Sequence, residues 1–136
     1  MKSKFKEGQV ALYQNGTTFG NEMPPVKEYL SAQQRDGKNL EAADIYKNTW
    51  LWLKSLNCEK FVNSQLIEQY ATSVARWLQC EEAITKFGFL GKHPITGAPI
   101  QSPYVAMSQS YMKQANLAWL QIQDDVMEQL LRSRRK

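Results

Sequence analysis

Two stretches of the sequence decide the fold: FVNSQLIEQYATSVARWLQCEEAITKF (residues 61–87) and SPYVAMSQSYMKQANLAWLQIQDDVMEQLL (residues 102–131). In both stretches apolar residues recur at spacings of three and four, which is the period of an amphipathic helix. Only the short, turn-rich segment 88–101 separates them. We therefore predict an all-α fold built around two long helices that form an antiparallel hairpin.

The first of these helices has one apolar seam and a clear end. We expect the seam to contain Ile67, Tyr70, Val74, Trp77 and Ile84, with Glu81 interrupting it. Gly88 follows the last periodic residue, Phe87, and a glycine at this place is the usual helix stop.

The segment between the two helices contains turn chemistry and a helix start. Thr96-Gly97 lies between Ile95 and Ile100, which predicts either a small β-hairpin or an ordered loop. Ser102-Pro103 then predicts the start of the second helix, with Ser as N-cap and Pro at the first helical position.

The second helix has more apolar surface than one partner helix covers. Its expected inner seam consists of Val105, Met112, Ala115, Trp119, Ile122 and Val126. A second stripe consists of Leu117, Leu120, Met127 and Leu131, and a third of Tyr104, Met107 and Tyr111. Between Ser102 and Gln123 the only formally charged residue is Lys113. Because one helix covers only one such stripe, we expect the others to pack against a third helix, a neighbouring subunit, or both.

The N-terminal part predicts a loosely ordered arm followed by one shorter helix. Turn residues recur throughout residues 1–38. Within them, Val10–Tyr13 favours a short strand or tether, and Val26–Gln34 favours a short helix opened by Pro24-Pro25. Asn39 is the expected N-cap of the shorter helix. The apolar positions of that helix are Leu40, Ala43, Tyr46, Trp50 and Leu53.

These patterns divide the chain into residues 1–38 as an N-terminal arm, residues 39–131 as a helical oligomerisation core, and residues 132–136 as a basic C-terminal tail. A length of 136 residues fits one domain. No run of about 20 apolar residues is present, so we expect no membrane span. The basic N-terminus is followed by no apolar segment, so we expect no secretory signal and a cytoplasmic protein.

The net charge of +4 is concentrated at the two ends of the chain. The basic residues of the ends are Lys2, Lys4, Lys6, Arg132, Arg134, Arg135 and Lys136. Such tails suit contact with phosphates or with an acidic partner. The alternative is that they are solvated termini, which serve solubility only. In an oligomer the same tails form a ring of positive charge, which favours nucleic acid.

The residue types of a catalytic or metal site are scarce. His93 is the only histidine, which excludes sites that need two. The run from Gly88 to His93 lacks the spacing of a phosphate-binding loop. Glu81-Glu82 and Asp124-Asp125 are adjacent on helices and diverge by about 100°, so neither pair chelates a metal unaided. Cys58 and Cys80 are in no metal or redox spacing and are expected to be buried thiols. We expect no enzyme activity, cofactor, metal or small-molecule substrate.

A set of co-linear segments resembles the P27 family of phage terminase small subunits. These segments are Gln69-Tyr70-Ala71, Ser73-Val74-Ala75-Arg76-Trp77, Cys80-Glu81-Glu82, Lys92-His93-Pro94, Thr96-Gly97 and Ser102-Pro103-Tyr104-Val105. The order of elements is also similar: a tryptophan-bearing helix, a long helix ending in Gly, a short loop, and Ser-Pro opening a last helix. The resemblance covers roughly residues 26–130.

The resemblance implies a role in genome packaging by a tailed phage or prophage, in the cytoplasm of the bacterial host. Small terminase subunits are non-catalytic rings that recognise viral DNA and deliver it to the large subunit, which carries the ATPase and the nuclease. The implied partners are double-stranded viral DNA, the large terminase subunit and further copies of this chain. The residues implied for core and subunit interface are Tyr70, Val74, Trp77, Val105, Met112 and Trp119.

The DNA-reading part of the family pattern is not matched. Small terminases often have a helix-turn-helix module ahead of the oligomerisation core, and residues 1–56 do not provide its three helices. We therefore assign DNA contact to the basic ends of the chain and to Lys38, Lys47 and Lys54 on the shorter helix. The alternative is an oligomeric helical adaptor in virion assembly that does not bind DNA directly.

Overall fold

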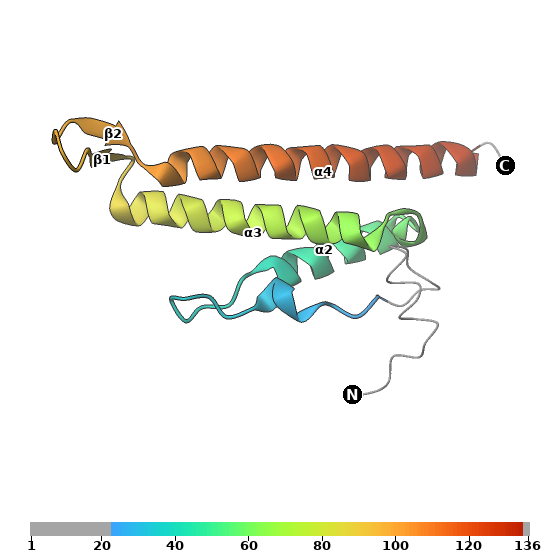
Figure 1. Ribbon diagram of the computed structural model, residues 1–136. Helices are drawn as coiled ribbons and strands as arrows, with labels where there is room; N and C mark the ends of the chain where they lie inside the picture. Colours follow the sequence, from blue (N-terminus) through green and yellow to red (C-terminus); the bar gives the residue numbers. More distant parts are fainter. Residues whose placement is uncertain (1–22, 135–136) are drawn as a thin grey trace.

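The computed structural model describes residues 23–134, and helices dominate it. The elements are the 3-10 helix η1 (Glu28–Ser31), α2 (Ala42–Ser55), the 3-10 helix η2 (Glu59–Phe61), α3 (Ser64–Phe87), β1 (Leu90–Lys92), β2 (Pro99–Gln101) and α4 (Pro103–Arg134). In Figure 1, α3 and α4 lie side by side, with the C-terminal end of α4 extending beyond α3, and α2 lies on the other side of α3. The predicted helical hairpin with a shorter preceding helix is confirmed. The expected strand or tether at Val10–Tyr13 lies outside the described residues.

The start of α2 differs from the prediction. The helix begins at Ala42, and Asn39 forms an isolated antiparallel bridge with Gln33. The backbone NH of Leu40 donates to the carbonyl of Ala32 at 2.9 Å, across a turn at Asp36-Gly37. This turn uses the backbone groups that an earlier helix start would need, so Asn39 as N-cap was wrong. The expected helix at Val26–Gln34 is reduced to η1 for the same reason.

The long helix α3 begins later than predicted and ends where predicted. The side chain of Asn63 accepts a hydrogen bond from the NH of Gln65 at 2.7 Å and caps the helix, whereas Phe61 belongs to η2. Gly88 has φ +96°, and its NH donates to the carbonyl of Ile84 at 2.8 Å. A positive φ favours glycine, which confirms the stop.

A small antiparallel β-hairpin connects α3 and α4, which is the first of the two predicted alternatives. Leu90 pairs with Gln101, and Lys92 with Pro99. In the turn, Nδ1 of His93 accepts hydrogen bonds from the NH groups of Ile95 at 3.1 Å and Thr96 at 3.2 Å. The lone histidine therefore has a structural role in the turn.

The start of α4 is the predicted one, and its end lies further along the chain. The hydroxyl of Ser102 accepts a hydrogen bond from the NH of Tyr104 at 3.2 Å. The helix runs to Arg134, and Arg132 forms an ion pair with Glu128 at 2.9 Å one turn earlier. Basic residues in the last turn interact favourably with the helix dipole, so Arg132 and Arg134 extend the helix.

The core lies at one end of the hairpin, where three helices meet. Its largest fully buried side chains are Leu30, Tyr46, Trp50, Leu53, Ile67 and Ile122. These residues come from η1, α2, α3 and the C-terminal half of α4. Toward the β-hairpin, α3 and α4 continue as a pair beyond α2 (Figure 1), and the turn before α2 lies near α3 through Gln34, which accepts a hydrogen bond from Arg76. Cys58 and Cys80 are buried and free, and burial raises the pKa of both thiols.

Candidate functional site

The apolar seam of α3 is made of smaller residues than predicted. Ile67 is fully buried, as expected, together with Ala71 and Ala75. The larger predicted members are only half-buried, namely Tyr70, Val74, Trp77 and Ile84. Small residues allow α2 to approach one side of α3 closely, while α4 covers another side, so the bulky side chains are left at the margins of both contacts.

On α4 most of the predicted inner seam is buried. Val105, Ala115, Ile122 and Val126 are buried, which confirms four positions of the seam. Met112 is 43% exposed, so placing it in the inner seam was wrong. The buried position one turn before it is Ser108, whose hydroxyl donates to the carboxylate of Glu81 on α3. Ala118 is also buried on this side of α4. Ser108 and Ala118 are the buried positions of α4 that sequence reasoning missed.

An aromatic cluster joins the three helices. The rings of Trp52 (α2) and Trp119 (α4) have centroids 5.4 Å apart, and those of Tyr70 (α3) and Trp119 are 5.3 Å apart. Such tilted pairs contribute about 0.5–1.5 kcal/mol each beyond the area they bury. Trp119 is thus half-buried within the single chain, and the cluster ties α4 to α2.

The outer stripe of α4, defined as Leu117, Leu120, Met127 and Leu131, is exposed. Its members are 63%, 56%, 56% and 49% exposed, respectively. The third stripe is also accessible, with Tyr104 37% and Met107 44% exposed. A contiguous apolar surface on a single chain is typical of an interaction site. The predicted surplus of apolar helix surface is therefore confirmed for the single chain.

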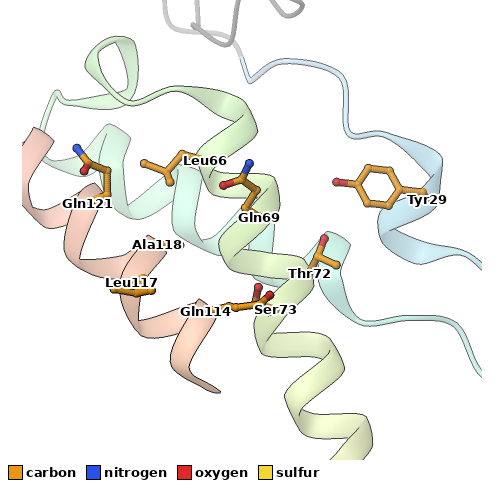
Figure 2. A pocket seen from close by; sticks show the side chains of 9 residues that line it. All are labelled: Tyr29, Leu66, Gln69, Thr72, Ser73, Gln114, Leu117, Ala118 and Gln121. Atoms are coloured by element: carbon orange, nitrogen blue, oxygen red, sulfur yellow. The ribbon is translucent and has the colours of Figure 1, made fainter. Parts of the chain in front are cut away.

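A groove runs between α3 and α4 on one side of the hairpin (Figure 2). Its lining consists of Tyr29, Leu66, Gln69, Thr72, Ser73, Gln114, Leu117, Ala118 and Gln121. None of these side chains is ionic, and Tyr29 reaches the groove from η1, outside the hairpin (Figure 2). A neutral groove with amide and apolar walls suits a neutral, partly apolar partner such as another helix.

Glu68 holds the Tyr29 wall of this groove in place. Its Oε1 accepts a hydrogen bond from the hydroxyl of Tyr29 at 3.0 Å and lies 3.5 Å from Nζ of Lys27. Burial raises the pKa of the Glu68 carboxyl to about 7, even though both neighbours favour its charged form. Neither Tyr29 nor Glu68 was singled out from the sequence, since their partnership spans 39 residues.

Of the candidate DNA-binding residues that lie within residues 23–134, two are brought together on one helix side. Lys47 and Lys54 are exposed on α2 and lie seven residues apart, so they share one side of the helix. Nζ of Lys54 lies 5.6 Å from the ring centre of Trp50. Lys38 belongs to the turn before α2, so placing it on the helix was wrong. The remaining candidates on α4 are Arg132, which pairs with Glu128, and Arg134. Lys2, Lys4, Lys6, Arg135 and Lys136 lie outside the described residues.

Within residues 23–134, no group of three or more His, Cys, Asp or Glu side chains is placed to hold a metal ion. The adjacent carboxylates have other contacts: Glu81 accepts from Ser108, and Asp125 accepts from Gln121 at 3.1 Å. In the same range, no helix is both long and apolar enough to cross a membrane.

Comparison with known proteins gives one match. A family model described as phage terminase, small subunit, matches residues 42–123. No curated protein and no solved structure matches the chain. The matched range is more than half of the chain and contains α2, α3, the β-hairpin and the first two thirds of α4.

Proposed function

Because the chain belongs to the small-subunit family of phage terminases, we propose that it acts as the small terminase subunit of a tailed phage or prophage, within the P27 group of that family. In this role it is a non-catalytic oligomer that binds viral DNA and recruits or regulates the large terminase subunit. The site of action is the cytoplasm of the bacterial host cell.

The exposed outer stripe of α4 carries the proposal of a ring. The helix has 32 residues, which is about 48 Å, and one of its long sides is left without a covering element in Figure 1. An isolated chain would present this apolar side to water, which costs about 25 cal/mol for each Å². A second copy removes that cost. Contacts between two different surfaces of identical chains close into rings when the rotation permits.

Native mass spectrometry of the full chain is the experiment that tests the ring. We expect one closed oligomer with a defined number of subunits. A single-copy species at high protein concentration would contradict the proposal, because the outer stripe would then need no partner.

We propose that double-stranded DNA is bound mainly through its phosphates. The supporting residues are Lys47 and Lys54 on one side of α2, multiplied around the ring, together with the basic ends of the chain. Each phosphate neutralised adds about 0.9 to the slope of log affinity against log salt concentration. Fluorescence anisotropy should therefore show a steep loss of DNA affinity between low and moderate salt. A flat titration would contradict this mode of binding.

The double variant Lys47→Glu/Lys54→Glu tests the α2 contribution. We expect weaker DNA binding and a smaller salt slope at unchanged oligomer mass. Lys60→Glu with Lys113→Glu is the matched control, since both side chains are exposed and neither lies on α2. Equal losses in the two double variants would show that only net charge matters.

The second candidate function is an oligomeric adaptor in virion assembly without direct DNA contact. The observation in its favour is that, among residues 23–134, only two of the candidate lysines lie on one surface. Deleting Met1–Lys6 or Arg132–Lys136 separates the two functions. If the protein is a small terminase, the deletion weakens DNA binding while the oligomer mass stays the same. If it is an adaptor without DNA contact, the deletion does not change DNA binding.

The large terminase subunit is the proposed protein partner, and it would supply the catalysis. We expect the purified chain alone to neither hydrolyse ATP nor cleave DNA. Adding it to its large subunit should change the ATPase rate of that subunit. ATP hydrolysis by the chain alone would contradict the non-catalytic role.

A further inference from the structure

Arg76 on α3 is a half-buried guanidinium, and no carboxylate among residues 23–134 forms an ion pair with it. One terminal nitrogen donates to the amide oxygens of Gln34 at 2.7 Å and Gln79 at 2.8 Å. Arginine has five N–H donors in a planar fork, so its carboxylate-binding geometry is largely unused. Burying a charge costs free energy unless the charge is both hydrogen-bonded and paired with an opposite charge.

The surroundings of Arg76 form an accessible groove. This Arg76 groove is lined by Arg76, Gln79, Cys80, Tyr104, Met107 and Tyr111. Its nearest lining residues, Arg76 and Tyr111, lie about one helical turn closer to the β-hairpin than Ser73 and Gln114 of the groove in Figure 2. Its α4 wall is the exposed third stripe. An aromatic and thioether wall beside a cation suits an apolar segment that carries one carboxylate.

Asp124 lies within an apolar stripe of that kind. It interrupts the outer stripe between Leu120 and Met127, so that residues 117, 120, 124, 127 and 131 follow the 3–4 spacing of a coiled-coil seam. The neighbouring acids have partners, since Asp125 accepts from Gln121 and Glu128 pairs with Arg132. The side chain of Asp124 makes no hydrogen bond or ion pair with any described residue.

These two unmatched charges cannot meet within one chain. Arg76 lies beside Tyr111 in its groove, and Asp124 is thirteen residues further along α4. At 1.5 Å per residue this separation is roughly 20 Å along the helix. Only Asp124 of a second copy can reach Arg76.

We propose that the outer stripe of one copy docks in the Arg76 groove of the next copy, with Asp124 forming an ion pair with Arg76. This inference rests on the proposed oligomer and names the surfaces that build it. The two surfaces differ, so the contact is head-to-tail and every copy uses both. Neighbouring copies in a cyclic ring are related by rotation alone, so Asp124 of one copy and Arg76 of the next lie at the same height along the ring axis. Because these two residues are roughly 20 Å apart along the hairpin of each copy, the hairpin must be inclined to that axis.

Charge reversal in the full chain tests the pair. Arg76→Asp and Asp124→Arg should each raise the concentration at which the oligomer dissociates by at least about 30-fold, as expected when one partner of a buried charge pair is lost. The double variant Arg76→Asp/Asp124→Arg should recover the wild-type oligomer mass. Mixing the two single variants should also recover it if the ring has an even number of copies, because the variants can then alternate and each groove finds a stripe of opposite charge. Asp125→Arg is the matched control and should assemble normally.

The outcomes separate this inference from the function on which it rests. The ion pair is overturned if the oligomer mass is unchanged in both single variants, or if the double variant does not restore it. In either case the wild-type oligomer itself is still supported. A single-copy wild-type protein overturns both. Loss of DNA affinity at intact mass in Arg76→Asp also overturns the pair, since Arg76 would then meet a phosphate. If circular dichroism shows that Arg76→Asp does not fold, Arg76→Gln replaces it, and undiminished assembly of that variant overturns the pair.

Discussion

Glu68 is the titratable residue on which the pH dependence of stability should depend most clearly. Its pKa is raised by burial from 4.5 to about 7. The folded chain therefore holds the proton more tightly than the unfolded chain between these values. The free energy of unfolding should fall as the pH rises from 4.5 to about 7, and should then level off. The slope contributed by one proton is at most about 1.4 kcal/mol per pH unit.

Denaturant titrations at several pH values check this expectation, with Glu68→Gln as the comparison. The variant keeps an acceptor for the Tyr29 hydroxyl and cannot titrate, so its unfolding free energy should lose that slope. Glu28→Gln is the control, since Glu28 is exposed on η1. Equal slopes for wild type and Glu68→Gln would show that Glu68 is not the responsible group.

Trp119 gives a second prediction for a single residue. Full burial of tryptophan would predict a loss of about 3–5 kcal/mol on truncation to Ala. Trp119 is half-buried and stacks on Trp52 and Tyr70, so we expect a loss of about 2–3 kcal/mol in Trp119→Ala. Urea unfolding followed by far-ultraviolet circular dichroism measures it, and the exposed Lys113→Ala should stay within about 0.5 kcal/mol of wild type. A change as small as that of Lys113→Ala would mean that the cluster adds no stability.

At the scale of elements, one helix end and one helix start were predictable because each depends on one or two residues of special chemistry. Gly88 ends α3, and Ser102-Pro103 begins α4. The start of α2 was not predictable in the same way, because the bridge between Gln33 and Asn39 competes with the helix. The facing side of α4 depends on Ser108 meeting Glu81. Three apolar stripes on one helix do not reveal which stripe faces inward.

The junction between α3 and the β-hairpin provides a prediction at this scale. Gly88 has φ +96° and ψ 155°, a region of the backbone that is essentially restricted to glycine. We expect Gly88→Ala to lower the free energy of unfolding by about 1–3 kcal/mol. Gly91→Ala is the control, because its φ is not positive and a Cβ there would meet nothing within 4 Å. Equal stability of the two variants, measured by thermal unfolding, would show that the junction is not strained.

At the scale of the whole molecule, the core and the exposed apolar surface occupy different regions. Three helices enclose Trp50 and Ile122 at one end, while the outer stripe runs along the open side of α4. The sequence indicated that α4 had surplus apolar residues, and the exposed outer stripe confirms this. The sequence did not indicate the neighbourhood of Arg76, because Gln34 and Gln79 reach it from separate elements.

This separation predicts that assembly can be removed while the fold is kept. Leu120 and Met127 are each 56% exposed, so the double variant Leu120→Gln/Met127→Gln removes little buried area from the single chain. We expect unchanged helicity, a change in the unfolding free energy of the isolated chain of no more than about 1 kcal/mol, and loss of the oligomer in native mass spectrometry. Ile95→Gln is the control, since Ile95 is 87% exposed but lies in the β-hairpin turn. If the oligomer survives in the double variant and dissociates in Ile95→Gln, the interface lies at the β-hairpin and not on α4. The reason is that the oligomer is held together by the apolar surface that a neighbouring copy covers.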